Sequence, residues 1–159
     1  MDLIVLELDG IDGEYTVEGF EKKIKVMSYS WGVSQPMVGD AANQKRTAGR
    51  PNHQDFMFTK VMDLASCKLI DYCNNSTVIK TGKMSVIHES EKKMVAYMVY
   101  EFTELLVSSY SVGAGGDVPT ESVTLNYAKI TQTYTVQGVD VANPGKDSCV
   151  WDLTKNSAT

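Results

Sequence analysis

The sequence predicts a mainly β protein, with two packed antiparallel sheets forming a small β-barrel, one short α-helix at about residues 62–73 and a long extended loop at 33–52. Short segments of alternating apolar and polar residues recur along most of the chain, as expected for strands. Only 62–73 places apolar residues four apart, which is the helical period. Residues 33–52 have little regular pattern, and loops of this length are usually functional or disordered.

The first two predicted strands are 3–8 and 22–31. Successive side chains of a strand point to opposite faces, so alternate residues share a face. One face of the second strand carries Ile24, Val26, Ser28 and Ser30. Because this face changes from apolar residues to serine, we expect Ser28 and Ser30 to meet water or a wet interface. The other face ends in aromatic residues, and Gly32 ends the strand.

A strand at 55–60 follows the loop and places Phe56 and Phe58 on one face. The helix comes next, with an apolar stripe made by Ala65, Leu69 and Cys73, and it ends at Asn74, Asn75 and Ser76. Asp55 and Lys60 flank the apolar positions of the strand. For each of them the sequence predicts a structural ion pair or hydrogen bond.

The second half of the chain contains further strands, predicted at 77–89, 93–102, 104–112, 121–136 and 150–153. Residues 90–92 form a plausible tight turn, and the glycine-rich run 113–117 forms a flexible one. In 121–136 the apolar residues move from odd to even positions. A bulge near Ala128 would exchange the two faces in this way and let the strand bend from one sheet into another.

Composition and charge restrict the possible functions. The chain has 159 residues, 43% of them hydrophobic, which predicts a single domain spanning 1–159 with a substantial core. Its net charge of -5 argues against a nucleic-acid partner. There is no run of 18 apolar residues and no basic, apolar start typical of a signal peptide. We therefore expect folding in the cytosol and no membrane insertion.

The sequence offers no pattern typical of an enzyme. Its three cysteines, Cys67, Cys73 and Cys149, are odd in number and predict buried, reduced thiols rather than a disulfide framework. The two histidines, His53 and His88, lie in no zinc, triad or nucleophile-elbow pattern. The glycine-rich turn lacks the lysine and helix of a phosphate-binding loop. We expect no catalytic residues, no metal and no cofactor.

Charge is distributed unevenly along the chain. Residues 2–21 contain acidic residues and no basic one, whereas the loop contains Lys45, Arg46 and Arg50 with the single acid Asp40. Arginine is favoured at interfaces because its planar guanidinium makes several directed hydrogen bonds. One hypothesis is therefore that the loop of one copy meets the acidic start of another.

Four segments resemble the haemolysin-coregulated protein (Hcp) family of the bacterial type VI secretion system. The first, IKVMSYSWGVSQP, ends a strand with Trp-Gly, and the second, DFMFTK, is an Asp-Phe-x-Phe-Thr-Lys strand. The third, LLVSSYSVGAGG, is a Leu-Val-Ser-Ser strand with a glycine turn, and the fourth, ESVTLNYAKI, contains a Val-Thr-Leu-Asn-Tyr-Ala strand. They occur in family order. Chain length and the single helix agree as well, so the resemblance covers essentially the whole chain.

The resemblance implies a structural subunit. Family members form hexameric rings that stack into a tube, which a contractile sheath expels with a spike tip, and effector proteins ride in the lumen. It implies export from the bacterial cytoplasm without a cleaved signal peptide. Ser30 matches the strand that helps to line the lumen, and Ser28 would share its face. The loop with Lys45, Arg46 and Arg50 matches an extended loop that reaches toward the next ring.

Two other hypotheses remain open at the sequence level. The first is a monomeric β-barrel that binds a small apolar ligand, for which the aromatic and methionine content gives weak support. The second is a hydrolase that uses one of the many serines, although the sequence provides no evident base. Oligomeric mass distinguishes the ring from the ligand-binding barrel, and a panel of substrates tests the hydrolase.

Overall fold

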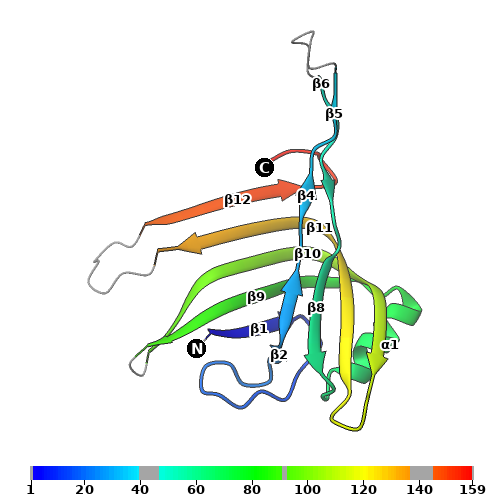
Figure 1. Ribbon diagram of the computed structural model, residues 1–159, viewed down its shortest axis with the longest axis vertical. Coiled ribbons are helices and arrows are strands. Elements are labelled where there is room, and N and C mark those ends of the chain that lie inside the picture. Colours follow the sequence, from blue (N-terminus) through cyan, green and yellow to red (C-terminus); the bar gives the residue numbers. More distant parts are fainter. Residues whose placement is uncertain (1, 40–46, 91–92, 137–144, 159) are drawn as a thin grey trace.

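The computed structural model describes residues 2–39, 47–90, 93–136 and 145–158, and it is almost entirely β (Figure 1). The strands that build the barrel are β1 (Asp2–Leu8), β2 (Ile24–Val26), β3 (Ser28–Ser30), β8 (Phe56–Val61), β9 (Ile79–Ser90), β10 (Lys93–Gly113), β11 (Thr120–Thr135) and β12 (Lys146–Asp152). The remaining elements are the short strands β4 (Val33–Ser34), β5 (Met37–Val38), β6 (Thr47–Ala48) and β7 (Asn52–His53), and the helix α1 (Ser66–Asn75).

One eight-stranded antiparallel sheet forms the body of the molecule. Its order is β2-β1-β9-β10-β11-β8-β3, and β12 pairs with the second half of β11. The first and last strands of this order are neighbours in the chain, separated only by Met27. The sheet therefore curls into an almost closed barrel, which confirms the predicted fold class of a β-barrel with one helix.

The segment predicted as one strand, 22–31, is divided at Met27. Before the break Ile24 and Val26 are buried, and after it Ser28 and Ser30 are exposed. The prediction that these four residues share one face is therefore wrong. The physical reason is that the chain leaves β1 and joins β8 at this point, where the Met27 N–H donates to the Thr59 carbonyl at 2.8 Å.

A second change of face occurs where the long strands β10 and β11 cross the barrel. In β10 the buried residues have even numbers up to Phe102 and odd numbers from Leu105 on. In β11 they have odd numbers up to Tyr127 and an even number at Ile130. These residues are cross-strand partners, so both strands bend at one level. The exchange of faces predicted near Ala128 is confirmed, but the bulge predicted as its cause is wrong, because the register of β10 and β11 is regular at this level. The two strands predicted at 93–102 and 104–112 are one, since Glu104 continues β10 with φ of 52°.

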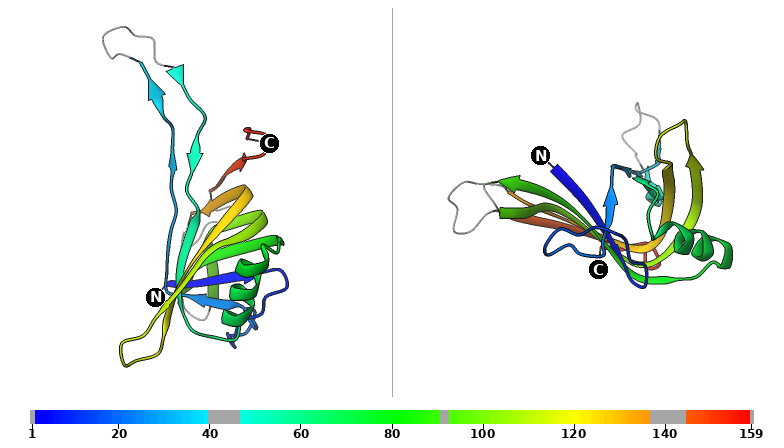
Figure 2. Two further views of the ribbon diagram at one scale, coloured as in Figure 1. Left: turned by 90° about the vertical axis from the view of Figure 1, so that its right-hand side faces the viewer. Right: turned by 90° about the horizontal axis from the view of Figure 1, so that it is seen from below.

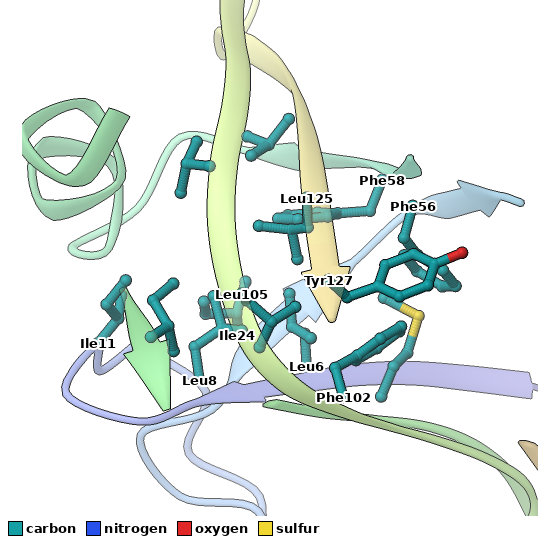
Figure 3. Packing of buried hydrophobic residues seen from close by; sticks show 14 of the residues in the cluster. Leu6, Leu8, Ile11, Ile24, Phe56, Phe58, Phe102, Leu105, Leu125 and Tyr127 are labelled. Carbon is teal, nitrogen blue, oxygen red and sulfur yellow. The ribbon is translucent and has the colours of Figure 1, made fainter. Parts of the chain in front are cut away.

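The core lies inside the curled sheet and is covered by α1 (Figure 3). Aromatic rings from three strands meet there, with the Phe56 and Phe102 centroids 4.9 Å apart and those of Phe102 and Tyr127 5.6 Å apart. Leucines from β1, β10 and β11 belong to the same buried cluster, including Leu6, Leu105 and Leu125. Each fully buried side chain of this size contributes roughly 1.5–3 kcal/mol to folding.

The helix begins at Ser66, four residues later than the predicted start at 62. Asp63 is the reason, because its Oδ1 accepts the Ala65 N–H at 3.0 Å and holds the chain in a turn that competes with the helix. The helix buries Leu69 and ends at Ser76, which takes the left-handed conformation and donates its N–H to the Tyr72 carbonyl. Among the described residues, no helix is long and apolar enough to cross a membrane.

The described residues of this segment, 33–39 and 47–53, form an arm rather than an irregular loop. β4 pairs with β7 and β5 pairs with β6, so the described parts of the segment run as a narrow antiparallel ribbon. The left-hand view of Figure 2 shows this ribbon extending well beyond the barrel. The sequence did not predict these pairings because each strand is only two residues long.

The three cysteines are free, as predicted, but they are not all buried. Cys67 and Cys149 are exposed and Cys73 is half-buried. Cys67 lies on the outward side of α1, and Cys149 lies in β12, which pairs with only one strand of the described chain. The prediction of three buried thiols is therefore wrong for two of them.

Candidate functional site

The outer surface of β3, β8, β11 and β10 carries hydroxyl groups at nearly every position. Side chains that are direct cross-strand partners share a face, and two rows of partners cross these four strands. The rows are Ser28, Thr59, Ser122 and Ser111, and Ser30, Met57, Thr124 and Ser109. We call these eight residues the hydroxyl face. Met57 is its single apolar member, and its side chain is 39% exposed.

Hydrogen bonds along the hydroxyl face link the strands to one another. Ser28 Oγ and Thr59 Oγ1 lie 2.6 Å apart, and Ser109 Oγ and Thr124 Oγ1 lie 2.6 Å apart. Each hydroxyl has one donor and two acceptor positions, so these bonds leave further capacity directed to solvent. The face is therefore uncharged, well hydrated and able to form many weak polar contacts.

Asp55 lies at the border of the hydroxyl face. Its carboxylate accepts hydrogen bonds from Ser108 Oγ at 2.8 Å and from Asn126 Nδ2 at 3.0 Å. Ser108 is the extra residue at the point where the β10–β11 register shifts. The hydrogen-bonding role predicted for Asp55 is confirmed. Its carboxylate is oriented by hydrogen bonds from neighbours on two strands.

Ser28 and Ser30, the residues that the sequence singled out, both lie on the hydroxyl face and are exposed. The structure places five further hydroxyl residues beside them, and sequence reasoning missed these. The available signal was the polar half of the alternation in 121–125, where Ser122 and Thr124 separate buried residues. Without the pairing of β11 with β8, this signal did not connect the residues to Ser28 and Ser30.

Of the three basic residues predicted in the loop, only Arg50 lies within the described residues; Lys45 and Arg46 lie outside them. Arg50 is near the base of the arm, and its Nη2 donates to the Leu153 carbonyl at 2.7 Å. Its guanidinium therefore has an intramolecular partner in the turn that follows β12.

Aromatic side chains hold the base of the arm against the barrel. Trp31 Nε1 donates to the Tyr127 hydroxyl, which donates to the Gln54 carbonyl at 3.0 Å. The His53 ring stacks on Trp151 with 6.1 Å between centroids. Burial lowers the pKa of His53 and raises that of Tyr127 to about 12, so both rings are neutral at pH 7.

A small apolar cavity opens beside these rings. It has a volume of about 260 Å³, and its walls include Trp31, Val33, His53 and Trp151. Pockets for drug-sized ligands usually measure roughly 300–1,000 Å³. Its size gives little support to the hypothesis of a barrel that binds a small apolar ligand.

A buried ion pair lies beneath the start of α1. Lys60 Nζ is 2.5 Å from Glu121 Oε2, and neither side chain is exposed. Lys60 also donates to Asp63 Oδ1 at 2.7 Å and to Ser66 Oγ at 3.1 Å. Burial acts to raise the pKa of Glu121, but hydrogen bonds from Lys60, Ser66 and Tyr110 outweigh it and lower this pKa below its usual range. The ion pair predicted for Lys60 is confirmed.

His88, the second histidine, helps to fix the N-terminal strand. Its Nδ1 is 3.0 Å from Asp2 Oδ1, and Tyr97 donates its hydroxyl to Asp2 Oδ2 at 2.8 Å. These two hydrogen bonds lower the pKa of Asp2, and the one with His88 has the larger effect. Within the described part of the chain, no three His, Cys, Asp or Glu side chains are grouped so that they would hold a metal ion.

Comparison with known proteins reveals extensive similarity. A family model described as "Type VI secretion system effector, Hcp" matches residues 5–134. A curated relative, "Protein hcp1" of Pseudomonas aeruginosa, is 32% identical over 108 residues, which cover 66% of this chain and 67% of the relative.

Solved structures extend the similarity to nearly the full length of the chain. The "Structure of a type six secretion system protein" has a TM-score of 0.90 with 27% identity, and 99% of each chain is covered. The "crystal structure of Hcp1 from Salmonella typhimurium" has a TM-score of 0.81 with 25% identity and the same coverage.

Proposed function

Because the chain belongs to the Hcp family and is thus a secreted, non-enzymatic tube protein of the type VI secretion system, we propose that it forms hexameric rings that stack into the inner tube. In this proposal the hydroxyl face lines the lumen of the ring and carries effector proteins. Its partners are then further copies of itself, effector proteins, and the spike and sheath of the system. It is made in the bacterial cytoplasm and exported without a cleaved signal peptide.

The hydroxyl face is the observation that carries this proposal. A surface that lines the lumen of a ring stays in contact with water, so its side chains must be hydrated. It must also bind cargo weakly enough to release it. Hydroxyl groups on four adjacent strands meet both requirements, because they form many weak hydrogen bonds and bring no net charge. Ser28 and Ser30 form one edge of this face, which supports their assignment to the lumen.

Free sheet edges support the formation of rings. In the described chain β12 pairs only with β11, so its outer edge offers unpaired backbone groups to a neighbouring copy. A contact between two different patches on successive copies closes into a ring when the rotation permits. In this arrangement residues 1–159 act as a single domain.

The distribution of charge supports stacking. Figure 1 shows the arm at one end of the molecule and the segment between β1 and β2 near the other. The arm segment carries Lys45, Arg46 and Arg50, whereas the β1–β2 segment carries Asp9, Asp12, Glu14, Glu18 and Glu21. Copies stacked in the same orientation would bring these opposite charges toward each other, and electrostatic complementarity favours such encounters.

Light scattering on a size-exclusion column tests the ring directly. At two protein concentrations we expect a mass six times that of the chain, because ring contacts should persist when the protein is diluted moderately. A monomer at both concentrations would reject the tube function. It would also favour the ligand-binding barrel in spite of its small apolar cavity.

Reversing the charge of the arm should prevent stacking without dissolving the ring. The variant Arg46→Glu with Arg50→Glu replaces attraction to the acidic segment with repulsion between like charges, which costs several kcal/mol at an interface. Electron microscopy should show single rings in place of tubes. Reversal of two exposed lysines away from the arm, Lys80→Glu with Lys83→Glu, is the control. Tubes of normal length in the arm variant would contradict the stacking role.

A further inference from the structure

The arm and the C-terminal end of the chain are joined by a specific hydrogen bond. Arg50 Nη2 donates to the backbone carbonyl of Leu153 at 2.7 Å, across 103 positions of sequence. The donor is a charged guanidinium, and hydrogen bonds of this kind are roughly twice as strong as neutral ones. The acceptor belongs to the turn that follows β12. We call residues 152–157 the C-terminal turn.

The C-terminal turn is organised by a single carboxylate. Asp152 Oδ1 accepts hydrogen bonds from the Thr154 N–H at 2.9 Å, the Thr154 hydroxyl at 2.5 Å and the Lys155 N–H at 3.2 Å. The backbone closes the turn, because the Asp152 N–H donates to the Ser157 carbonyl at 2.8 Å. Leu153 is also held, since its N–H donates to the Ala128 carbonyl at 2.8 Å. The Leu153 carbonyl is therefore presented to Arg50 in a fixed direction.

The same C-terminal segment contacts the arm at a second point. Trp151, the residue before Asp152, stacks on His53 at the end of β7 with an interplanar angle of 19°. Arg50 and His53 are three residues apart on the returning strand of the arm. Trp31 and Tyr127 hold the base of the arm next to Gln54. The contacts of His53 and Arg50 lie farther along the returning strand, so they restrict the angle at which the arm leaves the barrel.

We infer that the C-terminal turn is a positioning element that fixes the direction of the arm, and that stacking of rings depends on this positioning. Arg50 then acts through its hydrogen bond to Leu153 as well as through its charge. The dependence of stacking on this positioning rests on the proposed function. The positioning of the arm by the C-terminal turn concerns the folded chain alone and is measured separately.

Two variants separate positioning from charge. Arg50→Gln removes the charged donor from the arm, whereas Asp152→Ala leaves the charge of the arm intact and removes the acceptor that organises the turn. A role of Arg50 through charge alone predicts no effect of Asp152→Ala on the arm.

A milder variant, Thr154→Val, removes only the hydroxyl bond to Asp152 and is used if Asp152→Ala does not fold. Thr133→Ala, which removes the exposed 3.2 Å hydrogen bond to Ser148 between β11 and β12, is the matched control.

The first readout is the position of the arm. Spin labels at Met37→Cys and Thr103→Cys, on a chain whose native cysteines are replaced by serine and which is diluted with unlabelled protein, report the distance from arm to barrel. We expect a distance distribution about twice as wide in Arg50→Gln and Asp152→Ala as in the parent and in Thr133→Ala, since a fixed contact becomes a pivot. An unchanged distribution in both variants would overturn the inference.

The second readout is stacking, measured by electron microscopy on unlabelled rings at one protein concentration. We expect the fraction of rings in tubes to fall about tenfold in both variants, the effect of losing one charge-assisted hydrogen bond. Normal tubes in either variant would overturn the dependence of stacking on the turn. If the parent forms no rings, the proposed function and this dependence both fail, while the label distances still decide whether the turn positions the arm.

Discussion

Lys60→Met is expected to lower the free energy of unfolding by about 3–5 kcal/mol, because it leaves the Glu121 carboxylate buried without its cation. Neither side chain of this pair is exposed, so water cannot take the place of the missing partner. Asp63 and Ser66 lose a hydrogen-bond donor at the same time. The start of α1 depends on this group of residues, and the helix should loosen with it.

Urea denaturation at a fixed protein concentration measures the loss. The matched control is Lys23→Met, which breaks a pair that is 3.1 Å long but partly exposed, and which should cost less than about 1 kcal/mol. The double variant Lys60→Met with Glu121→Leu should regain most of the loss, because neither charge then remains buried. An equal loss for Lys60→Met and Lys23→Met would show that burial of the Lys60 pair has no special weight.

Acid should remove the same stabilisation in the parent protein. The pKa of Glu121 is lowered in the folded state, so the folded chain binds fewer protons than the unfolded chain near pH 4. The contribution is therefore complete above the unfolded pKa of about 4.3 and is lost as the pH falls through the lower, folded value. The difference in stability between the parent and Lys60→Met should shrink over this range.

The sequence pattern was sufficient for most of the barrel but not for the partner of Lys60. Alternation places Phe56, Phe58 and Lys60 on one face of β8, and all three are buried as this parity requires. The sequence predicted a structural ion pair or hydrogen bond for Lys60, but it did not predict that the side chain would be buried. Glu121 was not identifiable as its partner, because the two residues meet only through the pairing of β8 with β11.

The elements that the sequence missed depend on contacts between distant segments. The break at Met27 exists because β2 pairs with β1 while β3 pairs with β8, and a continuous alternating pattern carries no sign of that division. The arm consists of two-residue strands that pair with each other, so no period develops along them. The hydroxyl face likewise appears only when four strands are aligned, and only Ser28 and Ser30 were predicted from the sequence.

The last expected result concerns this face and the carriage of effectors. In the proposed ring, Ser30→Gln should leave the mass of the ring unchanged and lower the amount of bound effector about tenfold, which corresponds to roughly 1.4 kcal/mol of lost contact energy. Ser30 is the cross-strand partner of Met57, so the longer amide covers the apolar side chain of the hydroxyl face and, in the proposed ring, projects into the lumen. Serine contributes no bulk there, whereas glutamine does.

The measurement is co-purification of a small type VI effector expressed together with the tagged ring, quantified against the amount of ring protein. Thr81→Gln is the control, because Thr81 is exposed on β9, outside the hydroxyl face and away from the strand edge proposed for the ring contact. The variant Met57→Ser tests the apolar contact by itself, and a loss there would assign Met57 to the effector contact. Equal retention of effector by Ser30→Gln and Thr81→Gln would place the cargo outside the hydroxyl face, because a blocked face cannot bind as well as an open one.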